Sequence, residues 1–298
     1  MEDLGGVLGV AIEAARVGVE VQRTHLGTVL ETEWEEKGVH DFVTRVDREA
    51  ESRIVARVRA AYPDHAILAE EESTGAGPVA ASNGAGRHAR GGEGGAAGAG
   101  ASGGGDPSGA RRPGWLWIID PLDGTTNYLH GYPMYAVSIA ALKDGELAVG
   151  VVMHGVSGET WTAVRGQGAF LDGRPIRVSA TTRMSSALIG TGFPFRALDV
   201  LPSYVRQFER VIHATAGLRR GGSAALDLCH VATGYFDAFW EHRLAPWDVA
   251  AGTLIIREAG GVVTRIDGDP DVLDAGSLLA GNPHVHAALM SILNESGT

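Results

Sequence analysis

The chain has 298 residues, of which 44% are hydrophobic, 6% aromatic and 20% charged, as in a globular protein of one large or two closely joined domains. Its formal net charge of −11 argues against nucleic acid as the main partner, because binding to a phosphate backbone depends on basic residues. No apolar run approaches the roughly 18 residues of a membrane span, and the N-terminus lacks the basic and apolar stretches of a signal peptide. The single cysteine, Cys229, excludes an internal disulfide, and we expect it to be a buried thiol of a cytoplasmic protein that contacts no membrane.

The first part of the chain predicts two helices and a strand. Residues 5–30 carry apolar side chains at helical spacing, and Asp47–Ala61 interleaves charged with apolar residues before Pro63. Residues 66–71 resemble a short buried strand that ends in acidic residues.

The composition then changes over residues 75–112, which are mostly Gly, Ala and Ser, with Val79 as the only larger aliphatic residue. Such a segment buries too little apolar surface to offset the entropy of ordering it, so we expect a disordered surface insertion. A linker between two domains is the alternative, but acidic residues on both sides of the segment favour one shared site. We hypothesise that this insertion loosens the chain near Glu71 and weakens the metal requirement there.

The rest of the chain predicts strands followed by helices that alternate with strands. The predicted strands are 135–142, 146–154, 159–164, 169–179, 188–191, 235–240 and 262–266. The predicted helices are 204–213, 223–232, 247–259 and 283–294. This pattern predicts an α/β (α+β layered) protein, in which sheets alternate with helical layers.

The stretch WIIDPLDGTTN carries two carboxylates directly after a buried strand. We expect Pro121 to prevent simple continuation of the strand and Gly124 to allow a turn with positive φ, so that Asp120 and Asp123 project to one side. The chain would then restart as a helix at Thr125, whose free N–H groups could bind an anion. Carboxylates beside an anion would repel it unless a cation lies between them, and oxygen ligands of this kind suit Mg²⁺ or Mn²⁺.

A capped turn with solvated aspartates would explain this stretch if it stood alone. Four further acidic residues also lie at predicted element junctions, namely Asp47, Glu71, Glu241 and Asp248. For Asp248, the alternative is that its carboxylate caps the following helix and binds no metal. Six such positions together favour a metal site.

The motifs DFVTRVD, EEES, WIIDPLDGTTNY, GGSAALDL and PWDVAAGTLIIREAGG together resemble the inositol monophosphatase family of Mg²⁺-dependent, lithium-sensitive phosphatases. They occur in the family order and cover nearly the whole chain except residues 75–112. The resemblance implies one catalytic domain over residues 1–298 with an αβαβα sandwich, commonly found as a homodimer.

The resemblance also implies two metal ions, with a third held more weakly near Glu71. The implied ligands are Glu71, Asp120 and the main-chain carbonyl of Leu122 for the first ion, and Asp120, Asp123 and Asp248 for the second. Glu71 is preferred among three consecutive glutamates because the family motif Gly-Glu-Glu-Ser then places Glu70 at the glycine position.

The implied reaction is hydrolysis of a phosphate monoester by water, with Glu71 and Thr125 activating the water and Asp47 accepting a hydrogen bond from Thr125. The implied substrate contacts are Gly124, Thr125, Gly222, Ser223, Ala224, Glu241 and Asp248. His242 and Arg243 would either bind a second anionic group or be ordinary surface residues.

Among phosphorylated polyols and sugars, the GTTNY form favours myo-inositol monophosphate, because Thr126 stands where relatives for other substrates often carry lysine. Histidinol phosphate, or a broad range of sugar phosphates including fructose 1,6-bisphosphate, is the alternative. A different class of function is an accessory role in the transcription machinery, as in some bacterial relatives.

Overall fold

Two helix-covered sheets organise the protein in the computed structural model, which describes residues 3–30, 32, 34–38, 41–74, 114–273 and 276–295. The larger sheet has seven strands in the order β3-β4-β5-β6-β7-β8-β9. Its strands are β3 (Ala66–Ala69), β4 (Trp115–Asp123), β5 (Ala136–Lys143), β6 (Glu146–His154), β7 (Thr160–Val164), β8 (Ala169–Leu171) and β9 (Arg174–Pro175). β3 runs parallel to β4, and the remaining neighbours are antiparallel.

The smaller sheet has five strands in the order β11-β10-β12-β14-β13. These are β10 (Leu188–Thr191), β11 (Gly217–Arg219), β12 (Ala238–Leu244), β13 (Val262–Thr264) and β14 (Gly276–Gly281). A two-stranded ribbon of β1 (Glu35–Gly38) and β2 (Asp41–Val43) precedes the second helix.

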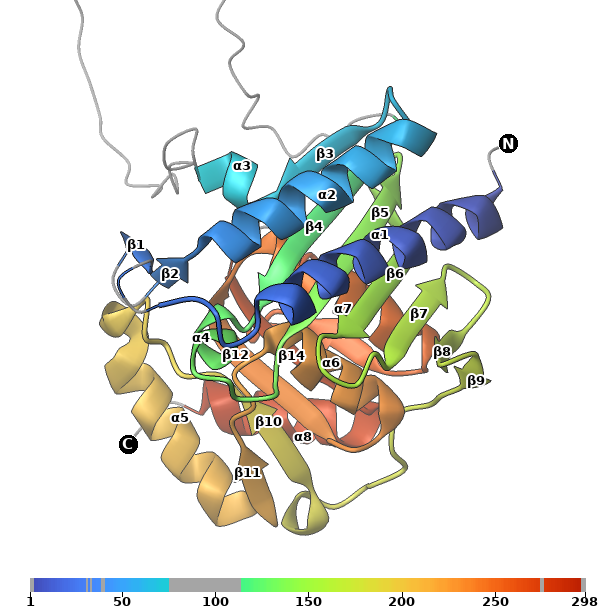
Figure 1. Cartoon of the computed structure of the whole chain (residues 1–298). Coiled ribbons are helices and arrows are strands. Elements are labelled where there is room, and N and C mark those ends of the chain that lie inside the picture. The colour runs from blue at the N-terminus through green and yellow to red at the C-terminus, as the bar shows by residue number, and fades with distance from the viewer. Residues whose placement is uncertain are drawn as a thin grey trace, which may run out of the picture.

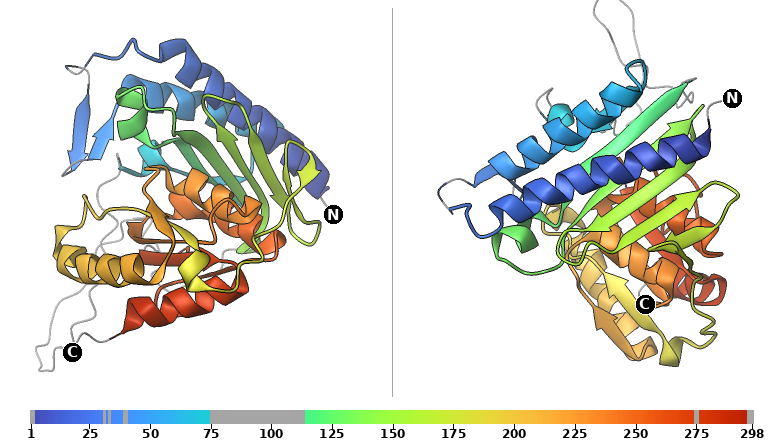
Figure 2. Two further views of the ribbon diagram at one scale, coloured as in Figure 1. Left: turned by 90° about the horizontal axis from the view of Figure 1, so that it is seen from below. Right: turned by 45° about the vertical axis from the view of Figure 1, so that its right-hand side comes forward.

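Three pairs of helices alternate with the two sheets (Figures 1 and 2). α1 (Leu4–His25) and α2 (Arg45–Ala61) cover the outer face of the larger sheet. α6 (Ala224–Thr233) and α7 (Pro246–Glu258) lie between the sheets, and α5 (Leu201–Ala214) and α8 (Pro283–Asn294) cover the outer face of the smaller one. This confirms the predicted αβαβα arrangement.

Burial explains the pattern of the strands. The central strands β4, β5 and β6 are covered on both faces, so their sequences are nearly continuous apolar runs rather than alternating ones. One apolar cluster lies between the larger sheet and α6 and α7, and a second lies between that sheet and α1 and α2. The single cysteine, Cys229, is buried in the first of these clusters, as predicted.

Several element boundaries differ from those predicted. α1 ends at His25 rather than at residue 30, and α2 begins at Arg45, where Thr44 and Asp47 form a capping box. β3 ends at Ala69, because the next residue starts the short helix α3 (Glu70–Thr74).

Two further predictions, both near the acidic residues, are wrong, and a third concerns residues that the structure does not describe. β4 continues through Pro121, and Glu241 lies inside β12 rather than after a strand. The predicted disordered insertion at residues 75–112 lies outside the described residues. No helix among the residues described is both long and apolar enough to cross a membrane.

Candidate active site

A β-bulge in β4 sets the direction of the first two aspartates. In the pairing of β4 with β5, Asp120 faces Ser138 and Asp123 faces Ala136, so two residues of β4 oppose one residue of β5 between them. Residues three apart on a regular strand point to opposite faces, but the extra residue restores the alternation. The proline at position 121 falls within this bulge, where a missing N–H is tolerated. Both carboxylates therefore project from one face of the sheet, as predicted, although the strand does not end where expected.

A third carboxylate reaches the same place from α7. One oxygen from each of Asp120, Asp123 and Asp248 lies within 4.8 Å of the others. The Ser138 hydroxyl on β5 donates to the main-chain carbonyl of Trp247 at 3.2 Å, which ties the start of α7 to the sheet beside the bulge. Residues more than 120 positions apart in sequence thus form one acidic cluster.

Each aspartate is held by main-chain N–H donors. Asp120 accepts from the N–H of Leu122 at 2.9 Å, and Asp248 accepts from the N–H of Ala245 at 2.7 Å as part of the N-terminal cap of α7. Asp123 accepts from the N–H of Ala225 at 2.8 Å, in the first turn of α6. These bonds fix the carboxylate directions before any ligand binds.

Ser223 supports this cluster from behind rather than contacting the cavity. It is the N-cap of α6, it is 1% exposed, and its hydroxyl donates to Asp123. Ser223 is absent from the cavity lining, so the direct substrate contact expected of it is corrected to a contact with Asp123.

A fourth acidic residue that lines the cavity beside the three aspartates is Glu70 and not the expected Glu71. The parallel pairing of β3 with β4 ends with Ala69 opposite Ile119, which brings the next residue, Glu70, beside Asp120. Glu70 lines the cavity with the aspartates. Glu71 instead lines a hollow between α2 and α3, together with Arg48.

Glu51 on α2 explains why Glu70, rather than Glu71, faces the cavity. It is 3% exposed, and its carboxylate accepts from the N–H groups of Glu71 at 2.7 Å and Glu72 at 2.9 Å. These bonds cap the first turn of α3 and hold its outer side against α2. The sequence gives no local signal for this, because the three glutamates are chemically equivalent.

The expected hydrogen bond between Thr125 and Asp47 is present. The Thr125 hydroxyl lies 3.1 Å from Asp47 Oδ1 and 3.0 Å from the carbonyl oxygen of Leu122. Asp47 is 1% exposed, and its other oxygen accepts from the hydroxyl and the N–H of Thr44. Thr125 begins the short helix α4 (Thr125–Leu129), after Gly124 at φ 91°. A methyl group on Gly124 would lie 2.8 Å from the Met134 carbonyl oxygen, so glycine is required there.

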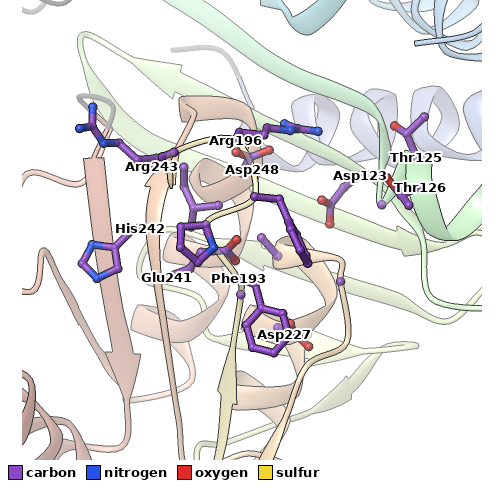
Figure 3. Close-up of a pocket in the computed structure, with 18 of the residues that line it drawn as sticks. Asp123, Thr125, Thr126, Phe193, Arg196, Asp227, Glu241, His242, Arg243 and Asp248 are labelled. Atoms are coloured by element: carbon purple, nitrogen blue, oxygen red, sulfur yellow. The ribbon is translucent and has the colours of Figure 1, made fainter. Parts of the chain in front are cut away.

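A cavity of about 190 Å³ connects this cluster to β12 and to the loop before α5 (Figure 3). It contains most of the expected site residues, which are Asp120, Leu122, Asp123, Gly124, Thr125, Gly222, Ala224, Glu241 and Asp248. It also contains residues that the sequence analysis did not assign to the site, namely Glu70, Phe193, Arg196, Arg220 and Asp227. The two arginines bring positive charge into the cavity, near Glu241 and, in the case of Arg196, also near Asp248 (Figure 3).

Glu241 occupies the end of the cavity opposite Thr125 (Figure 3). Burial, together with repulsion from Asp248, raises its pKa to about 8, and Arg220 partly opposes this rise. The carboxyl group lies directly on the Cα of Gly192, where an added Cβ would be 1.9–2.1 Å from its atoms. Glycine at position 192 therefore makes the room for Glu241.

His242 and Arg243 are both engaged with α5 and the segment before it. His242 Nε2 lies 2.8 Å from Gln207 Oε1, and Arg243 forms an exposed ion pair with Asp199 at 2.6 Å. Both residues also line the cavity, so a contact with a second anionic group of a substrate stays a prediction.

The acidic cluster fits a divalent cation. Burial, followed by repulsion from Glu70, raises the pKa of Asp120 well above its usual range. Burial also raises the pKa of Asp123 to about 6 and that of Asp248 to about 7. Buried carboxylates that are all ionised repel one another when no counter-ion is present. A cation bound between them neutralises this repulsion. The all-oxygen donor set suits Mg²⁺ or Mn²⁺.

Comparison with known proteins identifies the family. The sequence model of the inositol monophosphatase family matches residues 3–298. The chain belongs to the inositol monophosphatase family. Among curated members of this family, "Nus factor SuhB" of Pseudomonas aeruginosa is 42% identical over 96% of this chain and 95% of its own length. "Inositol-1-monophosphatase" of Rhizobium meliloti is 40% identical over 87% of this chain and 85% of its own length.

Solved structures of inositol monophosphatase family members share the fold. The extragenic suppressor protein suhB from Bartonella henselae superposes with a TM-score of 0.81 at 34% identity, covering 98% of this chain and 100% of that one. The inositol monophosphatase from Anabaena gives a TM-score of 0.76 at 34% identity, covering 98% and 96% of the two chains.

Proposed function

We propose that the protein is a phosphate monoester hydrolase that depends on Mg²⁺, or on Mn²⁺ as a substitute, and acts on a small phosphorylated polyol, with myo-inositol monophosphate as the favoured substrate. The convergence of Asp120, Asp123 and Asp248 within 4.8 Å of one another carries the proposal. Relatives named inositol-1-monophosphatase support the substrate.

The residues that would hold the ions are Glu70, Asp120, the Leu122 carbonyl, Asp123 and Asp248, with Glu70 replacing Glu71. When bound, the ions supply positive charge for the phosphoryl group and Lewis acidity that activates water. Asp47 accepts from the Thr125 hydroxyl, so that this hydroxyl is oriented to position the attacking water. Phosphoryl transfer requires mainly such alignment and charge neutralisation.

The remaining substrate would lie between the cluster and Glu241. Carboxyl groups bind the hydroxyls of a polyol well, and Gly222 and Ala224 line the same space. Histidinol phosphate and sugar phosphates such as fructose 1,6-bisphosphate are the alternative substrates. Arg196 and Arg220 favour the bisphosphate among them, because they could bind its second phosphate.

A phosphate-release assay tests the proposal. Inositol 1-phosphate, histidinol phosphate and fructose 1,6-bisphosphate are compared by kcat/KM, with and without Mg²⁺. We expect Mg²⁺-dependent release that is fastest for inositol 1-phosphate and that falls by about a hundredfold or more in Asp120→Asn. The surface variant Asp64→Asn is the matched control. Wild-type turnover by folded Asp120→Asn would refute the proposal.

A non-catalytic accessory role in the transcription machinery is the second candidate. Several relatives, at 36–42% identity, are named Nus factor SuhB. If a triple variant at Asp120, Asp123 and Asp248 left the cellular phenotype of the protein unchanged, the binding role would replace catalysis as the main function.

A further inference from the structure

Gln22 is a polar residue on the buried face of α1, where the other buried residues are apolar or glycine. It is 0% exposed. Its amide oxygen has no hydrogen-bond partner among the residues that the structure describes. A half-satisfied buried amide is costly for folding, and an apolar side chain would be favoured there if packing were the only requirement. Gln22 therefore points to a purpose beyond packing.

The amide nitrogen of Gln22 makes the contact that explains its presence. It donates to the carbonyl oxygen of Pro121 at 2.8 Å, across 99 residues of sequence. Pro121 lies in the β-bulge, between Asp120 and Asp123. A bulge removes one residue from the ladder of the sheet and leaves its polar groups to find other partners. Gln22 supplies that partner for the bulge carbonyl.

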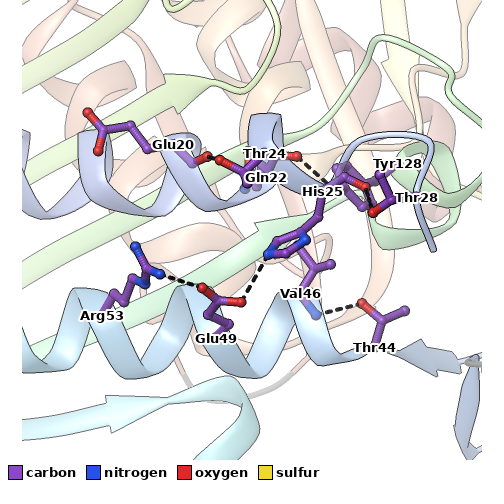
Figure 4. Close-up of polar contacts among 10 residues, drawn as sticks. All are labelled: Glu20, Gln22, Thr24, His25, Thr28, Thr44, Val46, Glu49, Arg53 and Tyr128. Atoms are coloured by element: carbon purple, nitrogen blue, oxygen red, sulfur yellow. Dashed lines mark hydrogen bonds and ion pairs between the residues drawn. The ribbon is translucent and has the colours of Figure 1, made fainter.

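The same residue also holds the next element of the site. The hydroxyl of Tyr128 donates to the main-chain carbonyl of Gln22 at 2.8 Å (Figure 4). Tyr128 is 2% exposed, packs edge-on against Tyr135 and belongs to α4, which begins with Thr125. One residue of α1 therefore contacts both the bulge that bears the aspartates and the helix that bears the threonine.

We propose that Gln22 is a positioning residue that sets the metal-binding geometry of Asp120 and Asp123 by fixing the bulge between them. The proposal rests on the proposed function, since it assumes that these carboxylates bind a divalent cation. Gln22 touches neither cation nor substrate, because α1 lies on the outer face of the sheet and the cavity lies on the inner face. Its influence passes through the carbonyl of Pro121 and the main chain on either side.

We predict that replacement of Gln22 weakens metal binding, and that a loss of folding stability alone does not explain this weakening. Gln22→Met keeps a similar length and volume but has no N–H to donate. We expect Mg²⁺ and Mn²⁺ to bind about tenfold more weakly, because removal of groups that orient metal ligands typically weakens binding by about 10–100-fold. The substrate KM at saturating Mg²⁺ should stay close to that of the wild type.

Calorimetric titration of the metal-free protein with Mn²⁺ or Mg²⁺ tests this without relying on turnover. Val7→Ala is the matched control, because Val7 is also buried on α1 at 0% exposure but lies about four turns from Gln22. It should lower Tm and leave metal affinity unchanged. If Gln22→Met does not fold, Gln22→Leu takes its place, because leucine also has no N–H to donate to Pro121.

The outcomes separate this inference from the proposed function. Weaker metal binding in the Gln22 variant, with unchanged binding in Val7→Ala, supports the positioning role. Unchanged affinity in the Gln22 variant, or an equal loss in both variants, overturns it. A wild-type protein that binds no divalent ion overturns the proposed function itself, and the inference with it.

Discussion

Asp120 and Asp123 lie on one strand at a spacing that normally separates side chains to opposite faces, yet their carboxylate oxygens lie within 4.8 Å of each other and of Asp248. The β-bulge between them adds one residue on β4 and so brings both to the inner face of the sheet. The site therefore depends on an irregularity of the sheet, and four predictions follow from its geometry.

The first prediction distinguishes Glu70 from Glu71. Glu70→Gln should weaken Mg²⁺ binding by about tenfold or more, because Glu70 lines the cavity beside Asp120. Glu71→Gln makes the same substitution one position away, where the side chain lines the hollow between α2 and α3. This variant should bind Mg²⁺ as the wild type does. Calorimetric titration of both variants gives the comparison. The reverse order of affinities would restore Glu71 as the ligand.

The second prediction concerns Thr125, whose hydroxyl lies 3.1 Å from Asp47. Thr125→Ala should lower kcat by about a hundredfold, because the group that orients the water is lost, while metal affinity changes little. Thr125→Ser keeps the hydroxyl and should retain most of the activity. Steady-state kinetics and metal titration separate the two effects. If metal affinity alone fell, the assigned role of Thr125 would be wrong.

The third prediction is a dependence of stability on pH and on metal. The pKa of Asp123 is raised to about 6 and that of Asp248 to about 7, from an ordinary value of about 4. Between the ordinary and the raised pKa values the folded protein binds more protons than the unfolded chain, so the free energy of unfolding falls as pH rises from about 4 to about 8. At higher pH both carboxylates are ionised in either state, and their contribution is constant.

Mg²⁺ should remove this penalty by neutralising the charged carboxylates. We therefore expect Mg²⁺ to raise Tm by several degrees at pH 8, and by much less at pH 5, where protons compete for the same oxygens. Thermal denaturation in EDTA and in Mg²⁺ at both pH values measures the difference. Asp248→Asn serves as the control and should show a smaller difference. A Tm shift that was equal at pH 5 and pH 8 would contradict the prediction.

The fourth prediction uses the contact between Gly192 and Glu241. A methyl group at position 192 would occupy the space of the Glu241 carboxyl group, so Gly192→Ala should displace it. We expect KM for a polyol phosphate to rise roughly tenfold, as for a lost hydrogen bond to a polar group, with a smaller change in kcat. Gly9→Ala is the control, since no atom lies within 4 Å of a Cβ added there. An unchanged KM would show that Glu241 does not contact substrate.

The sequence motifs indicated most of the site but not its support. Asp120, Asp123, Thr125 and Asp248 lie within short motifs, and each motif keeps its residues at fixed separations along the chain. Gln22 and Gly192 lie outside those motifs. Their contacts are with residues about 50 to 100 positions away, so no short motif indicates their roles.

The order of apolar runs, turn residues and acidic motifs was sufficient to predict the layered fold and the acidic cluster, because these patterns act over a few residues at a time. The tertiary structure alone decided that Glu70 rather than Glu71 faces the cavity, that Ser223 supports Asp123 from behind, and that β4 continues through a bulge. The physical reason is that each of these outcomes depends on strand register and on hydrogen bonds from elements distant in sequence. Such contacts exist only once the sheets and helices have packed together.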